Sequence, residues 1–128
     1  MLDIIVVPCK CGSGNRSISQ EEIGISLWFT KEKKWRMAIQ IGMKIMKQLR
    51  WNLGDFVQMG PIANKAGYWG IRRAATGLKI SKATSTQASA RIQGGGQYTP
   101  YFPQKNRIMS PVKFEDVEGE LLIKIPEE

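Results

Sequence analysis

The sequence contains no histidine and only two cysteines, so the commonest metal-binding and acid–base side chains are scarce. Without histidine, Cys9 and Cys11 cannot complete an ordinary Cys/His zinc site within one chain. A disulfide between residues two positions apart would close a strained ring, so we expect free thiols in a reducing compartment, with a redox or metal-capture role as the alternative. We therefore predict no metal site and no cofactor.

Long apolar runs are also missing. No stretch approaches the roughly 20 residues that cross a bilayer, and the opening MLDIIVVPCKCG lacks the basic start and the length of a secretory signal. The GSGN at residues 12–15 lacks the lysine-serine or lysine-threonine pair of a phosphate-binding loop. We expect a cytoplasmic protein that does not contact a membrane.

Acidic residues are rare in the middle of the chain, where residues 31–107 contain only Glu32 and Asp55. With no histidine, acid–base catalysis would fall to carboxylates or lysines, and we expect Asp55 to serve a turn. The acids between residues 115 and 120 are more typical of a solvated hairpin end than of a catalytic or metal-binding pair. We predict that the protein is not an enzyme.

What the sequence has in abundance is positive charge. The net charge is +8, and residues 31–107 hold fifteen Lys and Arg, whereas residues 108–128 hold six acids and two lysines. A segment this basic repels itself unless it spreads over a solvated face or meets a polyanion, and nucleic acid is the commonest polyanion in a cell. We expect the acidic end to neutralise part of the charge when nothing is bound.

The first half of the chain has clear hydrophobic periods. An apolar content of 42% over 128 residues fits one domain, 1–128. Alternation over 25–41 predicts a β-hairpin with one apolar face and a charged turn, KEKK. After Gly42 the spacing becomes helical in MKIMKQLRW, which predicts a helix of about two to three turns docked on the sheet. A hairpin–helix–hairpin core over 24–80 follows.

The helix is predicted to end in the stretch LRWNLGDFV. Asn52 and Gly54 tolerate left-handed backbone conformations, and Asp55 can accept hydrogen bonds from nearby backbone N–H groups. FVQM then begins another strand, and GYWGIRRA forms a further one after a loop. The turn therefore reverses the chain between a helix and a sheet.

The second half is less regular. Residues 81–97 are small, polar and basic without a period, which predicts a flexible polar linker or arm. In YTPYFP the prolines exclude a regular helix, and the rings of Tyr98, Tyr101 and Phe102 either cap the core or stack on bases. Residues 98–128 are expected to add C-terminal strands that complete the sheet.

The strand WRMAIQIG, the helix KIMKQLRW, the Gly-Asp turn and the strand FVQM together resemble the AbrB/MazE-like, or SpoVT-AbrB, DNA-binding proteins over about residues 34–80. Leu49, Gly54, Asp55 and Val57 stand in the corresponding places. The resemblance implies a mainly β fold with one short helix (α+β), a small β-barrel formed by two chains that exchange hairpins. N- and C-terminal strand extensions make a monomeric barrel the alternative. The chain is also similar to small uncharacterised proteins of temperate phages.

These patterns favour a nucleic-acid-binding protein, with DNA preferred over RNA, that acts as a small phage or prokaryotic regulator. Cations contact phosphates, and arginines can also pair with guanine edges. The cations that we expect at the interface are Lys33, Lys34 and Arg36 on the first arm, Lys44, Lys47 and Arg50 on the helix, Arg72 and Arg73 on a strand, and Lys79, Lys82 and Arg91 on a mobile arm. Arg72 and Arg73 are adjacent on a strand and must face opposite sides.

The alternative is a protein–protein interaction module or inhibitor that binds a host protein in a phage-infected cell. Basic surfaces also bind acidic proteins, and the four tryptophans, Trp28, Trp35, Trp51 and Trp69, would be its anchors where they are exposed. Salt distinguishes the two hypotheses, because binding to nucleic acid weakens steeply with salt.

Overall fold

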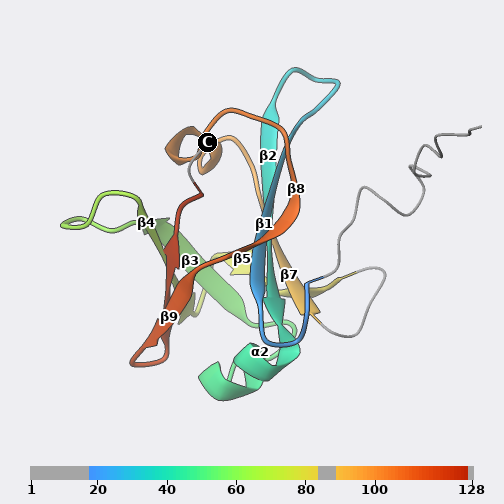
Figure 1. Ribbon diagram of the computed structural model, residues 1–128. Helices are drawn as coiled ribbons and strands as arrows, with labels where there is room; N and C mark the ends of the chain where they lie inside the picture. Colours follow the sequence, from blue (N-terminus) through green and yellow to red (C-terminus); the bar gives the residue numbers. More distant parts are fainter. Residues whose placement is uncertain (1–17, 84–88, 127–128) are drawn as a thin grey trace, which may run out of the picture.

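A computed structural model describes residues 18–83 and 89–126 (Figure 1). This part of the chain forms two five-stranded antiparallel sheets and one short α-helix. The prediction of a mainly β chain with one short helix is thus confirmed. Cys9, Cys11 and the strand expected near the N-terminus lie outside the described residues.

The first sheet, sheet A, has the strand order β6-β7-β2-β1-β8. Its central pair is the predicted hairpin, in which Ile25 faces Ile39 and Leu27 faces Met37 across the two strands. These apolar side chains alternate with small or polar ones, so one face of the sheet is buried. The bounds are β1 Ile23–Phe29, β2 Trp35–Gly42, β6 Ser81–Lys82, β7 Ser89–Gly94 and β8 Arg107–Val112.

The second sheet, sheet B, has the strand order β5-β3-β4-β10-β9. Trp69 and Ile71 on β4 point to the same side as Leu121 and Ile123 on their partner strand, and all four are buried. They join one apolar cluster with the inner residues of sheet A, so the core lies between the two sheets. The bounds are β3 Phe56–Pro61, β4 Tyr68–Ala74, β5 Leu78–Lys79, β9 Phe114–Val117 and β10 Glu120–Lys124.

The predicted helix is α2, Met43–Leu49, which follows β2 directly. It buries Ile45, Met46 and Leu49 against the core. It ends at Arg50, whose left-handed backbone (φ 61°) lets the N–H of Trp51 donate to the carbonyl of Met46 over 2.9 Å. A seven-residue helix is too short to be stable alone, so packing holds it.

Hydrogen bonds hold the Gly-Asp turn to the backbone of Ile80, which lies between β5 and β6. Asp55 Oδ2 accepts the backbone N–H of Asn52 over 2.8 Å, and Gly54 adopts a φ of 92°. The carbonyl of Ile80 accepts the N–H of Gly54, and the N–H of Ile80 donates to the carbonyl of Asp55, each over 2.8 Å. The turn therefore fixes β3 and also anchors the segment between β5 and β6.

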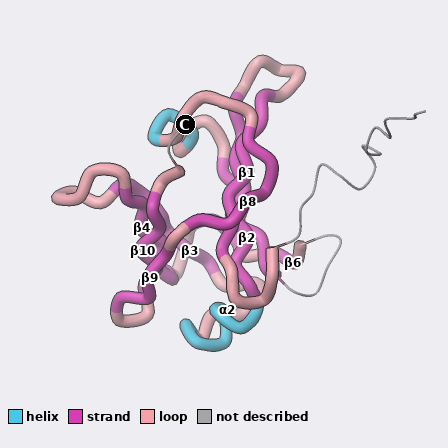
Figure 2. Tube along the Cα trace, in the orientation of Figure 1, coloured by secondary structure: helices cyan, strands magenta, loops and turns pink. Residues whose placement is uncertain are grey.

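The expected closed barrel is not found among the described residues, where strand pairing forms two separate sheets. The chain passes from one sheet to the other through α2 and at two corners, β5 to β6 and β8 to β9, with one intervening residue at each corner. Figure 2 shows the second corner, where β8 runs on into β9. The barrel does not close because α2 and the Gly-Asp turn carry the chain from β2 in sheet A to β3 in sheet B, so the two hairpins do not pair with each other. The hairpin β1–β2 and the hairpin β3–β4 consequently bury their apolar faces against each other.

The flexible arm expected over residues 81–97 is corrected by the structure. β7 pairs with β2 over its whole length, and Ala90 and Ile92 are buried while Arg91 and Gln93 point outward. The alternation is real but short, and its small residues Ser89, Ala90 and Gly94 hid it. β6 adds a two-residue edge, and residues 84–88 lie outside the described part.

Residues 98–126 contribute strands β8, β9 and β10, as expected. Between β7 and β8, the 3₁₀ turn η1, Thr99–Tyr101, brings three rings against Trp69. The ring of Phe102 is 4.9 Å from Trp69 and buried, and Tyr98 lies 6.2 Å away. Tyr98 and Phe102 therefore cap the core, as the first of the two sequence interpretations had it, whereas Tyr101, 5.6 Å from Trp69, keeps 51% of its surface exposed.

Candidate nucleic-acid interface

The structure does not gather the eleven predicted cations on one surface. Lys33 and Lys34 lie at the tip of the β1–β2 turn, and Lys44, Lys47 and Arg50 lie on or after α2, at the other end of β2 (Figure 1). Eight residues of extended strand separate these ends by about 25 Å. The two groups cannot contact the same phosphate, and the site must be sought in one of them or elsewhere.

Acids lie among the cations around α2. Lys44 forms an ion pair with Glu21 over 3.0 Å, and Gln48 of the same helix donates to Asp116 over 3.3 Å, which brings the acidic β9–β10 turn beside α2. Arg73 donates to the carbonyl of Arg50 over 3.0 Å and lies 3.8 Å from Asp55. An anion approaching this end of the molecule meets carboxylates as well as cations.

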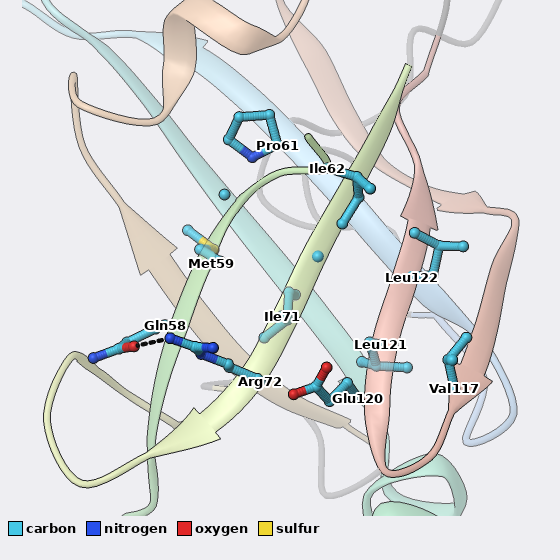
Figure 3. Close-up of a pocket in the computed structure, with 12 residues that line it drawn as sticks. Gln58, Met59, Pro61, Ile62, Ile71, Arg72, Val117, Glu120, Leu121 and Leu122 are labelled. Atoms are coloured by element: carbon cyan, nitrogen blue, oxygen red, sulfur yellow. Dashed lines mark hydrogen bonds between the residues drawn. The ribbon is translucent and has the colours of Figure 1, made fainter. Parts of the chain in front are cut away.

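The outer face of sheet B carries Arg72 and Lys79. Arg72 donates to the Gln58 side chain over 3.0 Å on the neighbouring strand, and Lys79 pairs in register with Phe56. Beside Arg72 a groove of about 510 Å³ runs over Gly60 and Gly70. Figure 3 shows Arg72, Gln58 and Glu120 gathered at one end of this groove and apolar side chains along the rest. Its chemistry is apolar with mixed charge, which does not select a polyanion.

The outer face of sheet A has a different charge. The five strands of sheet A contain no Asp or Glu, and every acid on a described strand belongs to β9 or β10 of sheet B. Arg36 and Arg91 both point outward on sheet A, since each pairs with an outward-facing residue of the neighbouring strand. Lys82 is exposed at the β6 edge of the same sheet. The fold therefore separates the charges that the sequence mixes.

Trp28 lies beside both arginines on this face. It pairs in register with Arg36, and the guanidinium carbon of Arg91 is 5.7 Å from the centroid of its ring. Arg91 reaches the ring across β2, where the intervening outward residue, Ala38, is small. The indole is half-buried against Ala38 and Met109 and remains partly exposed. An aromatic ring flanked by cations on a sheet is an arrangement that binds nucleic-acid bases and phosphates.

Sequence reasoning named Trp28 only as an anchor for a protein partner, and it did not include Arg107 among the interface cations. β8 shifts register against β1 between Ile25 and Leu27, and at this bulge Arg107 lines a surface cavity together with Trp28 and Arg91. Burial lowers the pKa of Arg107 and that of Arg91 below the ordinary arginine value. The alternation over β1 assigned Trp28 to the outer face, but nothing local placed Arg107 there.

The opposite end of the outer face is covered. Ile18 is buried against Ala38 and Met109, and the chain from Ser19 to Glu22 crosses the end of β2. The Gly42 N–H donates to the Glu22 carbonyl over 2.8 Å, so the backbones touch where a side chain would not fit. The open part of this face is therefore the half with Trp28, Arg36 and Arg91, which we call the sheet A interface.

Other chemistries find little support in the described part of the chain. No group of three or more Cys, Asp or Glu residues in 18–83 and 89–126 is arranged to hold a metal ion. Within the same residues no helix has the length and apolar character needed to span a membrane. Of the four tryptophans, Trp51 and Trp69 are buried and belong to the core.

Comparison of the chain with protein-family models, with curated proteins and with solved structures found no match. The function is therefore inferred from the geometry of the sheet A interface.

Proposed function

We propose that the protein is a non-enzymatic nucleic-acid-binding protein and that the sheet A interface is its binding surface. The single observation that carries the proposal is that Trp28 pairs in register with Arg36 and lies under the guanidinium group of Arg91, on a sheet whose described strands contain no carboxylate. A positive surface without its own acids concentrates a polyanion, and an aromatic ring adds stacking that a simple counter-ion cannot use.

The remaining predicted cations have a weaker role in this proposal. Lys33, Lys34 and Lys82 are exposed at the two ends of sheet A and can steer a long polyanion toward the interface. The cations around α2 and on sheet B contribute less to binding, because carboxylates or amide groups already lie beside several of them. Binding is thus expected to depend on a few arginines rather than on the total charge.

The likeness to the AbrB/MazE-like proteins belongs to this proposal. The order β2, α2, Gly-Asp turn, β3 and β4 supports it, since these elements follow one another as the resemblance implies. We propose DNA as the preferred nucleic acid and a regulatory role in a prokaryotic cell or a phage-infected host, with a homodimer as the assembly. The closed barrel is not part of the proposal.

The test is binding of labelled duplex DNA, single-stranded DNA and RNA at low salt, followed by fluorescence anisotropy. We expect the protein to bind DNA. Its affinity should fall by about tenfold when Arg36 and Arg91 are both replaced by Gln. The matched control is the double variant Lys44→Gln and Lys124→Gln, which removes the same charge away from the interface. No binding to any of the three probes at low salt would refute the proposal.

A protein partner is the second candidate, and the groove on sheet B favours it. The groove has a volume of about 510 Å³, and near it Phe56 and Val117 are exposed at 39% and 47% of their surface. An exposed apolar groove of this kind is suited to apolar side chains of another protein. Substitution of Leu122 by Asp would abolish such binding, and moderate salt would not.

A further inference from the structure

A second cavity lies on the outer face of sheet A, next to the proposed interface. Its volume is about 350 Å³, and its wall includes Trp28 and Arg91 together with Asn106 and Arg107, which precede and begin β8. The inference drawn from it rests on the proposed function and deepens it, because it concerns which form of nucleic acid the interface selects.

The polar groups that line this cavity are mainly hydrogen-bond donors. Arg107 is anchored by its Nε, which donates to the Ile25 carbonyl over 3.2 Å, so its two terminal amino groups remain available. Asn106 accepts the Phe29 backbone N–H with its Oδ1 over 3.3 Å, which directs the amide nitrogen to other partners. Arginine has no acceptor atom at all. A wall built of such donors suits an anion.

The two arginines also lack a compensating charge within the described residues. The only ion pairs there involve Lys44 and Arg73, far from this cavity. Burial lowers the pKa of both Arg91 and Arg107, because the protein has removed part of their water without supplying a carboxylate. A bound anion would replace the hydration that burial has removed from the two guanidinium groups. Anion binding is therefore favoured at this place.

We propose that this cavity binds one nucleotide of a single strand, with its phosphate between Arg91 and Arg107 and its base against the ring of Trp28. Arg91, which covers the ring in the unbound protein, turns to the phosphate and leaves the ring to the base. Bases of a duplex are stacked on one another and cannot reach the ring, whereas those of a single strand can. The phosphate and the base are common to DNA and RNA.

The first experiment measures the affinity of the full chain for three probes of equal length, oligothymidylate, oligouridylate and a DNA duplex. We expect the single strands to bind at least about tenfold more tightly than the duplex. Arg107→Gln should weaken single-strand binding about tenfold and duplex binding much less. Lys124→Gln, on β10 of sheet B, is the matched control and should change neither affinity by more than about twofold.

The second experiment follows the intrinsic tryptophan fluorescence. Saturating oligothymidylate should quench it in the native protein and quench it far less in Trp28→Phe, which keeps an apolar ring and is checked for an unchanged unfolding midpoint. Because Trp51 and Trp69 are buried, they should contribute little to the quenching. Equal quenching in the variant would overturn the assignment of the base to Trp28.

The outcomes separate this inference from the function on which it rests. Equal affinity for duplex and single strand, sensitive to Arg36 and Arg91 but not to Arg107, would overturn the single-strand site and leave nucleic-acid binding intact. Failure to bind any probe would remove both. A difference between oligothymidylate and oligouridylate would show that the site distinguishes the sugar or the 5-methyl group of thymine, the two features in which the probes differ, and would support the cavity in either case.

Discussion

The guanidinium carbon of Arg91 lies 5.7 Å from the ring centroid of Trp28, although the two side chains come from strands separated by β2. The contact spans the small residue Ala38 and ties the edge of sheet A to its centre. A cation held over an aromatic ring is stabilised by about 0.5–1 kcal/mol at an exposed site. The same pair is the part of the molecule most suited to a nucleotide.

The salt dependence of binding should reveal which cations contact phosphate. Replacement of Arg36 or Arg91 by Gln should flatten the plot of log affinity against log salt by about 0.7–0.9 per residue, because each lost contact releases one fewer counter-ion. Lys44→Gln should leave the slope unchanged, since that lysine is already paired with Glu21. Anisotropy titrations over a salt series provide the measurement. Identical slopes for all three variants would contradict the assignment.

Arg91 should matter for binding and little for stability. In Arg91→Met the loss of the cation–π contact is offset by the removal of a desolvated charge, so we expect the free energy of unfolding to change by less than about 1 kcal/mol. Affinity for nucleic acid should fall by about threefold at the same time, which is Arg91's share of the loss of about tenfold expected for the double variant with Arg36. Urea unfolding and binding titrations on the same sample test both halves. A loss of stability above about 2 kcal/mol would make Arg91 a structural residue instead.

Two strand glycines should respond oppositely to a methyl group. A Cβ at Gly42 would lie 2.2 Å from the Gln20 carbonyl oxygen, whereas a Cβ at Gly60 would meet no atom within 4 Å. Gly42→Ala should therefore destabilise the protein by about 1–3 kcal/mol by forcing residues 18–22 away from β2. Gly60→Ala should be neutral or stabilising by up to about 1 kcal/mol. Chemical unfolding distinguishes the two, and equal effects would show that the segment 18–22 does not pack as described.

The protein should be more stable with glycine in place of Arg50. Its backbone φ of 61° is left-handed, a conformation that costs an L-residue about 1–2 kcal/mol. Arg50→Gly should raise the free energy of unfolding by about 0.5–1 kcal/mol once the flexibility of glycine in the unfolded chain is counted. Because this residue lies at the α2 end and away from the sheet A interface, nucleic-acid affinity should change by less than about threefold. Thermal unfolding and anisotropy check the two expectations, and a large loss of affinity would return α2 to the binding surface.

The local elements could be predicted because each depends on a short pattern. The alternation in 25–41 and the helical spacing after Gly42 encode a hairpin and a helix that tertiary packing has no reason to override. The strand β7 escaped prediction since its outward positions carry Arg91 and Gln93 and its inward ones are partly small. A strand of this composition is stabilised by pairing with β2 rather than by its own sequence.

The candidate site was predicted only in part. Charge density pointed to arginines and lysines as a group, but a sequence does not show which cations have carboxylates beside them. Lys44, which was expected at the interface, pairs with Glu21 instead. Arg107, which was not expected there, lies at a bulge whose register depends on β1 and β8, two strands distant in the chain. Pairwise distances of this kind are properties of the fold.

By itself the sequence determined the class of the protein: a basic chain without histidine that alternates into hairpins and has one short helix at a Gly-Asp turn. These features depend on side-chain periods and turn chemistry, which act over a few residues. Only the tertiary structure decided that the two hairpins lie in separate sheets and that all acids on the described strands lie on one of these sheets. The physical reason is that burial of both apolar faces in one core chooses the partners of each strand, and electrostatic surfaces follow from that choice.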